Sequence, residues 1–157
     1  MIITDTYIIT NTDNIIPNIP LTITSDDWPE NASVFYQIKS DHRDGRPDKA
    51  QWQVNPEDEI ATFVFGFPNS ISGDYSWGLC FKENKPVILG ITKNGHNSRI
   101  AKFENKRQEI KNNPWHGYPA DYITDYTHDL PNIAILASWG LTESEIKRLK
   151  KGKGWRK

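Results

Sequence analysis

Residues 77–92, WGLCFKENKPVILGIT, place two apolar runs on either side of a short polar segment. Both runs are rich in the branched and aromatic side chains that favour extended backbone. The polar segment, residues 83–86, has the length and composition of a tight turn, so we expect a β-hairpin here. Because a hairpin pairs its strands antiparallel, this stretch predicts an antiparallel sheet. Residues 93–95, KNG, are typical of a turn and close the sheet region.

Further runs of the same kind precede the hairpin, each bounded by Pro, Asn, Asp or Gly. Together with the two hairpin strands they predict a mainly antiparallel sheet of about six to seven strands within residues 1–95. The expected strands are residues 2–10, 21–24, 33–39, 51–54, 60–67, 77–82 and 87–92.

From residue 98 onward the apolar spacing becomes helical. Ile100, Phe103 and Ile110 fall on one side of such a helix, and basic side chains fall mostly on the other. Pro114 ends the pattern. Pro119 suits the first position of a short helix, because its fixed φ angle is already helical.

Two more helices are expected near the C-terminus. Residues 131–139 begin with Pro and are followed by Gly140, which is suited to a left-handed helix stop. In residues 142–145, TESE, the Thr142 hydroxyl and the Glu145 carboxylate match a capping box that starts the last helix. We therefore predict one α+β domain over residues 1–157. Three to four short helices in residues 98–151 pack on the sheet, and residues 152–157 form a flexible basic tail.

Composition sets the broad class of the protein. A chain of 157 residues is long enough to bury one hydrophobic core, and six Trp supply large core-forming rings. Cys80 has no partner for an internal disulfide, and the first residues lack the pattern of a secretory signal. No apolar run is long enough to span a bilayer. These features predict a cytoplasmic protein without a membrane partner.

The net charge of −1 conceals two halves of opposite sign. Residues 1–74 contain 12 acidic and 4 basic side chains, whereas residues 75–157 contain 8 acidic and 15 basic side chains. If the fold keeps the halves apart, one face attracts anionic partners and the other attracts cationic ones. If the fold interleaves them, the charges only solvate the surface.

Residues 112–129, NNPWHGYPADYITDYTHD, concentrate the side chains most capable of chemistry. On a helix, Asp121, Asp125 and Asp129 would share one face and could hold a divalent metal. Carboxylates beside a histidine also suit acid–base work on a phosphodiester. The alternative is purely structural, with helix caps and packed tyrosines. The candidate catalytic residues are His116, Asp121, His128 and Asp129.

Two C-terminal features suggest nucleic acid. The helices around Gly140 are similar to a helix-turn-helix, although Glu143 and Glu145 give the second helix an acidic start that repels phosphate. The basic tail surrounds Trp155, and cations interleaved with an aromatic ring can track a nucleic-acid backbone. Such cations can equally offset the helix dipole without binding anything.

Residues 41–49, DHRDGRPDK, form a charged connection that is either a recognition loop or a solvated turn. Its two arginines provide fork-shaped donors for carboxylate or phosphate. The triplet His42-Arg43-Asp44 also occurs in kinase catalytic loops, but the chain lacks the accompanying glycine-rich loop. The candidate binding residues over the whole chain are Trp115, His116, Tyr118, Tyr122, Arg43, Arg46, Lys106, Arg107, Lys150, Lys151 and Trp155.

Three functions compete on this basis. The first is a small protein of the immunity, inhibitor or mobile-element accessory type that binds a protein partner and has no catalysis or cofactor of its own. The second is a small nuclease or phosphodiesterase that uses the His/Asp cluster, with a divalent metal in that case alone. The third is a DNA-binding protein that acts through the C-terminal helical hairpin.

Overall fold

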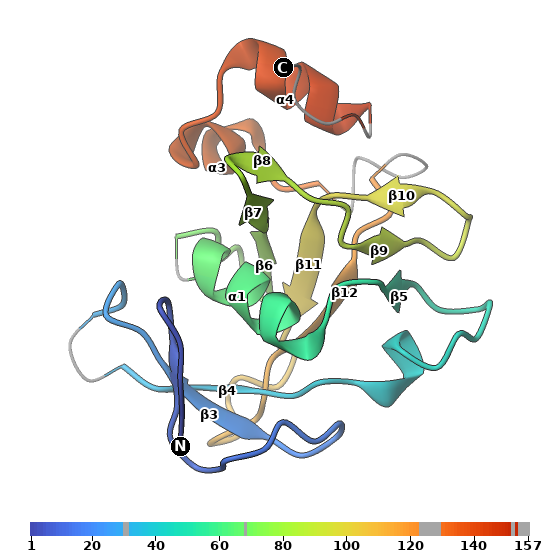
Figure 1. Ribbon diagram of the computed structural model, residues 1–157. Helices are drawn as coiled ribbons and strands as arrows, with labels where there is room; N and C mark the ends of the chain where they lie inside the picture. The colour runs from blue at the N-terminus through green and yellow to red at the C-terminus, as the bar shows by residue number, and fades with distance from the viewer. Residues whose placement is uncertain (30–31, 68, 123–129, 152, 154–157) are drawn as a thin grey trace.

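The computed structural model describes all residues except 30–31, 68, 123–129, 152 and 154–157. In the described residues, twelve short strands form four small antiparallel sheets, and helices α1, α3 and α4 accompany them (Figure 1). The predicted architecture is therefore wrong. It assigned the strands to one larger sheet and the second half of the chain mainly to helices, whereas half of the strands lie beyond residue 80.

The first sheet contains β1 (Ile2–Ile3), β2 (Ile8–Ile9), β3 (Leu21–Thr24) and β4 (Val34–Tyr36), in that order. Along β3 buried and half-buried residues alternate, as expected for a strand with one face on the core. Leu21 and Ile23 are the buried members of β3. This sheet confirms the strand predicted at 21–24, and the strand predicted at 2–10 is divided into β1 and β2.

Helix α1 (Pro56–Gly66) replaces the strand predicted at 60–67. The side chain of Asn55 caps it by accepting a hydrogen bond from the Asp58 amide at 2.8 Å, and Pro56 stands at its first position. Acidic side chains in the first turn favour the same start. The apolar run that looked like a strand is the buried part of this helix, since a short apolar run is ambiguous between the two states.

Strand β11 (Ala101–Glu104) lies where a helix was predicted over residues 98–111. It pairs on one side with β6 (Tyr75–Gly78) and on the other with β12 (His116–Pro119). Pairing on both edges satisfies the backbone of β11, and this tertiary gain outweighs the helical spacing of Phe103 and its neighbours. The short helix predicted from Pro119 is also wrong at its start, because Pro119 ends β12.

A third sheet joins β10 (Asn97–Ser98), β9 (Gly90–Ile91) and β5 (Gln51–Trp52). The hairpin predicted at residues 83–86 is confirmed by the pairing of β7 (Phe81–Lys82) with β8 (Lys85–Pro86). Glu83 and Asn84 both have positive φ angles, as the tightest hairpin turns require.

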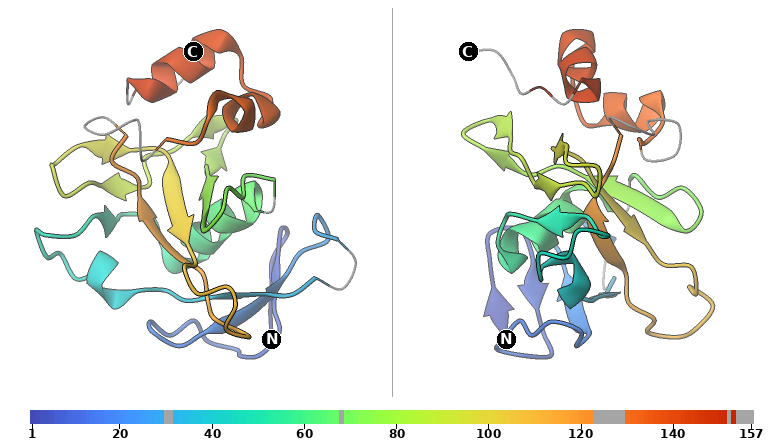
Figure 2. Two further views of the ribbon diagram at one scale, coloured as in Figure 1. Left: turned by 180° about the vertical axis from the view of Figure 1, so that it is seen from behind. Right: turned by 90° about the vertical axis from the view of Figure 1, so that its right-hand side faces the viewer.

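The C-terminal helices α3 (Ile133–Ser138) and α4 (Glu143–Lys150) confirm the predictions for this region. Both bonds of the capping box between Thr142 and Glu145 are present, and Gly140 has a φ angle of +78°. Figure 2 shows these helices at one end of the molecule and the N-terminal sheet at the other. Among the described helices, none combines the length and apolar character needed to cross a membrane.

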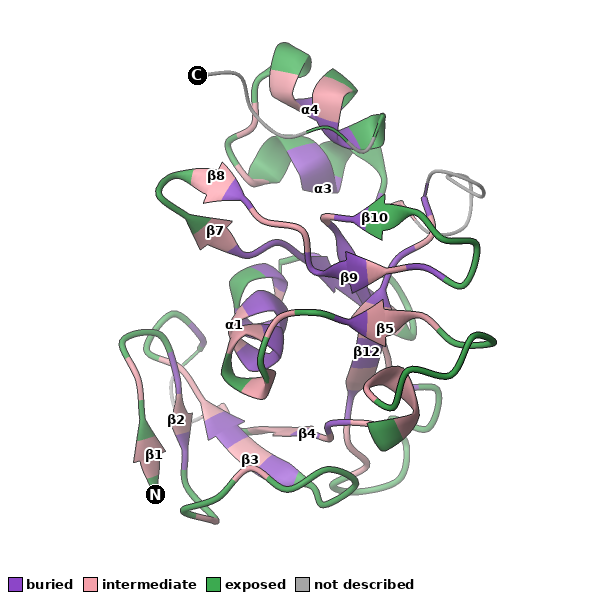
Figure 3. Cartoon of the chain, turned by 45° about the vertical axis from the view of Figure 1, so that its right-hand side comes forward, coloured by how far each residue is buried: buried purple, intermediate pink, exposed green. Residues whose placement is uncertain are grey.

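Two apolar clusters hold the molecule together. The larger one packs α1 against the N-terminal sheet and includes Phe63, Tyr36 and Phe103. The smaller one packs α3 and α4 against β6 and includes Trp77 and Leu149. Figure 3 shows the buried face of α1 turned toward the interior, with the β1–β2 hairpin on one side of the helix and β5 on the other.

Candidate functional site

A polar pocket of about 680 Å³ opens beside β12, on the side of the molecule that carries η1 (Ser40–His42), a 3-10 helix. Segments far apart in the sequence meet there: η1, the loop before β5, the turn between β9 and β10, and strands β11 and β12. The pocket is lined by Lys39, Asp41, His42, Asp48, Lys49, Ala50, Thr92, Lys93, Asn94, Glu104, His116, Tyr118, Pro119 and Asp121.

His116 and Glu104 are direct cross-strand partners on β12 and β11. Residues opposed in an antiparallel pair point to the same face, which brings the His116 Nε2 atom within 3.5 Å of a Glu104 carboxylate oxygen. Both side chains are half-buried, and the His116 Nδ1 atom is buried without a hydrogen-bond partner among the described residues. The pair is therefore held in place by the sheet itself.

Burial lowers the pKa of His116 below its ordinary value, because an imidazolium loses hydration in the pocket. The negative charge of Glu104 opposes this shift, while the charges of Lys39 and His42 add to it. His116 is therefore neutral at pH 7. A neutral imidazole is able to accept a proton, which is the property required of a general base.

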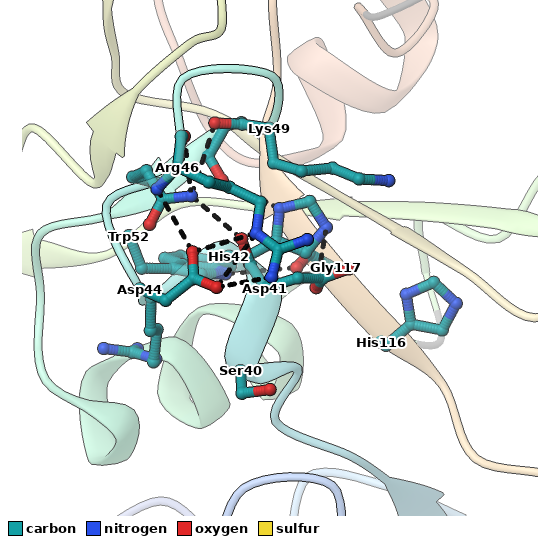
Figure 4. Close-up of polar contacts among 12 residues, drawn as sticks. Ser40, Asp41, His42, Asp44, Arg46, Lys49, Trp52, His116 and Gly117 are labelled. Atoms are coloured by element: carbon teal, nitrogen blue, oxygen red, sulfur yellow. Dashed lines mark hydrogen bonds and ion pairs between the residues drawn. The ribbon is translucent and has the colours of Figure 1, made fainter.

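His42 reaches the same pocket from η1. Its ring stacks on Tyr118 with centroids 5.5 Å apart and an interplanar angle of 22°. The Nδ1 atom lies 2.8 Å from the carbonyl oxygen of Ala50, and since a carbonyl only accepts, Nδ1 carries the proton. This leaves Nε2 as the nitrogen that can exchange a proton; it lies 3.9 Å from an Asp41 carboxylate oxygen. Figure 4 shows the His42 ring beside Asp41, with His116 projecting nearby from β12.

The segment that carries His42 is anchored from inside the protein. The next residue, Arg43, directs its guanidinium inward to Glu59 and to the carbonyl oxygen of Val54. The indole of Trp52 donates to the Gly117 carbonyl oxygen at 3.1 Å, which ties β5 to the strand that bears His116. These contacts hold in place the two elements that carry the histidines, η1 for His42 and β12 for His116.

Three lysines line the pocket. Among the described residues, Lys39, Lys49 and Lys93 form no ion pair, whereas Glu104 and Asp41 lie beside the two imidazoles. Lysine near an uncommitted cavity attracts anions, and the attraction is strengthened where the walls exclude water. The lining therefore combines two imidazoles with four carboxylates and three lysines, and the lysines are the groups able to receive an anion.

The structure brings three of the sequence candidates into this pocket, namely His116, Tyr118 and Asp121. The Asp121 carboxylate accepts a hydrogen bond from the Asn94 amide. Trp115 and Tyr122 are instead buried in the structure, with exposed fractions of 5% and 1%, so neither ring presents a binding surface.

The other candidates lie elsewhere. Arg46 pairs with the neighbouring Asp44 on the surface, and Arg43 is turned inward. The remaining described cations are exposed and are not part of the pocket lining: Lys106, Arg107, Lys150 and Lys151. Lys106 nevertheless borders the pocket, because its Nζ atom lies 3.9 Å from a carboxylate oxygen of Glu104. The candidates Asp125, His128, Asp129 and Trp155 lie outside the described residues.

His42, Glu104 and the lysines were not recognised as site residues from the sequence. His42 had been dismissed together with the kinase-like triplet, and Glu104 had been placed on a helix. Only the three-dimensional packing brings His42 and Glu104 together, because they lie sixty-two positions apart in the chain. Among the described residues, no group of three or more His, Cys, Asp or Glu side chains is placed to hold a metal ion.

Comparison of the chain with protein-family models, with curated proteins and with solved structures finds no match. Function must therefore be inferred from the chemistry of the pocket.

Proposed function

We propose that the protein cleaves a phosphodiester by general acid–base catalysis in the pocket beside β12. The observation that carries this proposal is the meeting of two imidazoles, His42 and His116, with lysines that have no ion pair in the described part of the chain. Acid–base cleavage needs one group that removes a proton and another that supplies one. The proposal keeps His116 from the nuclease hypothesis and replaces its aspartate partners with His42 and Glu104.

Neutral His116 takes the proton from the attacking hydroxyl, whose oxygen forms the new bond to phosphorus. Glu104, 3.5 Å from the ring, then stabilises the imidazolium that results. His42 serves as the general acid and gives a proton from Nε2 to the oxygen of the bond that breaks, while the Ala50 carbonyl keeps its Nδ1 proton in place. Lys39 and Lys49 offset the negative charge of the phosphate. The stacked pair of Tyr118 and His42 offers a ring surface beside the reacting group.

The test is cleavage of fluorogenic RNA and DNA oligonucleotides, with and without Mg²⁺. His116→Gln and His42→Gln are each expected to reduce the rate about a hundredfold or more, because each removes one proton-transfer group. The matched control is His96→Gln, since His96 is exposed and lies outside the pocket lining. Melting temperatures of all three variants should stay close to that of the parent. Absence of cleavage in the parent, or equal rates in all variants, would reject the proposal.

Binding of a protein partner is the second candidate function, and the described surface offers a specific reason for it. Large apolar side chains remain exposed on the N-terminal sheet and on α1, including Ile3 at 72% and Phe65 at 41%. Of these two side chains, Phe65 lines a groove, and an exposed apolar side chain beside a groove is typical of an interaction surface. The groove beside Phe65 is the one that fits this candidate.

A further inference from the structure

The geometry points to a docking groove for a cationic, amphipathic segment of a partner protein, located between the β1–β2 turn, α1 and β7. The groove has a volume of about 870 Å³. The β1–β2 turn, which lines it, lies on the other side of α1 from β5 (Figure 3). It is separate from the pocket proposed for phosphodiester cleavage, since the two share no lining residue. The inference names the partner chemistry for the second candidate function and is independent of the first.

The floor of the groove is apolar. Ala61 and Val64 on α1 lie along it, and Phe65 contacts Phe81 of β7 with ring centroids 5.5 Å apart. Phe65 also packs against Trp139, at 5.8 Å, and still leaves 41% of its surface exposed. An aromatic ring that is supported on one side and open on the other is the type of anchor point found at the centre of protein interfaces.

The rim of the groove is acidic. Asp5 comes from the β1–β2 turn, Asp27 from the loop after β3, and Glu57 from the first turn of α1. All three residues are exposed, and among the described residues none of their carboxylates has an ion pair. Lys82 is the one basic side chain among the described lining residues, and it is already bonded to Asp58 at 3.1 Å.

Stabilisation of the start of α1 accounts for only some of the acidic residues that line the groove. Glu57 and Asp58 stabilise the first turn of α1 by offsetting its dipole, which is a sufficient structural reason for both. Asp5 and Asp27 belong to other elements and cap no helix in the described chain. Burial raises the pKa of Tyr7 and the charges of Glu57 and Asp58 raise it further.

Charge complementarity decides the occupant. An acidic segment would meet like charges from the β1–β2 turn, from the loop after β3 and from α1, whereas Lys or Arg side chains would pair with three carboxylates that have no ion pair among the described residues. An apolar side chain between those cations would cover the exposed ring of Phe65. The fitting ligand is therefore an extended or helical segment in which basic residues flank Leu or Phe.

The test is a fluorescence anisotropy titration with a labelled peptide that alternates Arg-Lys pairs with Leu and Phe. A peptide with Glu in place of each basic residue is the charge control. Saturable binding of the basic peptide alone is expected, and the affinity should fall about tenfold between low and moderate salt. No saturable binding, or equal binding of both peptides, would overturn the inference.

Variants locate the binding. Phe65→Ser should weaken binding of the basic peptide more than tenfold. Ile133→Ser removes a more exposed apolar side chain outside the groove and should leave binding unchanged. Asp27→Asn should weaken binding of the basic peptide about threefold. Asp26 is adjacent in the chain but outside the lining, so Asp26→Asn should leave binding unchanged. Concentration-dependent self-association that Phe65→Ser abolishes would replace the partner with a second copy of the chain and overturn the inference. Cleavage assays on the same variants keep the two proposals separate, because the groove variants leave the pocket intact.

Discussion

Arg43 donates two hydrogen bonds, at 3.1 and 2.8 Å, to one carboxylate oxygen of Glu59, which is fully buried in α1. The second carboxylate oxygen accepts a 2.6 Å hydrogen bond from the buried hydroxyl of Tyr36. This pair connects α1 to the segment that carries His42 in the pocket. The interior of the protein and the proposed catalytic pocket therefore depend on the same ionic contact.

Removing Arg43 should destabilise the protein strongly. Arg43→Met leaves the Glu59 carboxylate buried without its cation, which costs about 3 kcal/mol of unfolding free energy. Arg46→Met is the matched control, because Arg46 forms an exposed pair with Asp44 and such pairs contribute little. Urea unfolding of both variants measures the difference. Equal stabilities would show that the buried pair has no net effect.

The same carboxylate predicts a pH dependence of stability. Burial raises the pKa of Glu59 to about 7, although Arg43 and Tyr36 act against the shift. In the unfolded chain a glutamate titrates near about 4.3, so the folded protein binds the proton more tightly than the unfolded chain does. The unfolding free energy must then decrease as pH rises through the interval between these two values, at up to about 1.4 kcal/mol per pH unit.

Glu59→Gln removes this titration and retains an oxygen that can accept from Arg43. Unfolding measured at several pH values between about 4.3 and about 7 should give a flatter profile for the variant than for the parent. The lowered pKa of His116 gives a slope of opposite sign, but it is present in both proteins and cancels in the comparison. Parallel profiles would contradict the assignment to Glu59.

The fold was predictable where local chemistry decides it. The capping box at Thr142 and the hairpin turn at Glu83 are short-range devices, and both are present. α1 also had a local signal, because Asn55 and Pro56 are typical of a helix start, but the apolar run after them was assigned to a strand. The strand identity of β11 had no local signal, since it depends on pairing with β6 and β12.

The pocket was predictable in part for the same reason. His116 and Tyr118 lie two residues apart on β12, so one stretch of sequence contained both. His42 and Glu104 join them only through the packing of η1 and β11 against that strand. Such contacts between distant segments cannot be predicted from a single sequence, because sequence patterns do not determine which strands become neighbours.

Titration of His116 tests the electrostatics of the pocket directly. Burial lowers its pKa, and the Glu104 carboxylate opposes that shift. Glu104→Gln should therefore lower the His116 pKa further, as measured by proton NMR titration of the ring. The His116 ring signal is identified by its absence from the spectrum of His116→Gln. Glu109→Gln is the control, because Glu109 is an exposed acid paired with Arg107 and lies outside the pocket. An unchanged pKa in Glu104→Gln would mean that the carboxylate does not act on this ring, and a higher pKa would mean that it acts in the opposite direction.

Close backbone approach between α1 and β6 predicts a large effect of a single methyl group. A Cβ atom at Gly78 would overlap the carbonyl oxygen of Thr62 in α1, and backbone cannot move aside as a flexible side chain can. Gly78→Ala should therefore lower the unfolding free energy by about 3 kcal/mol through overpacking. In contrast, Gly45→Ala enters open space and costs about 1 kcal/mol for its positive φ angle. Comparable losses in the two variants would argue against the tight α1–β6 contact.

The C-terminal helix offers the simplest test of a local device, because its start is held by two reciprocal bonds. The Thr142 hydroxyl accepts from the Glu145 amide at 3.1 Å, and the Glu145 carboxylate accepts from the Thr142 amide at 2.8 Å. Thr142→Ala removes the first bond and should cost about 1 kcal/mol, whereas Ser144→Ala, in the same exposed turn, should cost little. Since α4 buries Ile146 and Leu149 against β6 and its neighbours, the loss should be visible in global unfolding. A loss confined to helical content, with an unchanged unfolding midpoint, would mean that α4 opens independently of the rest of the protein.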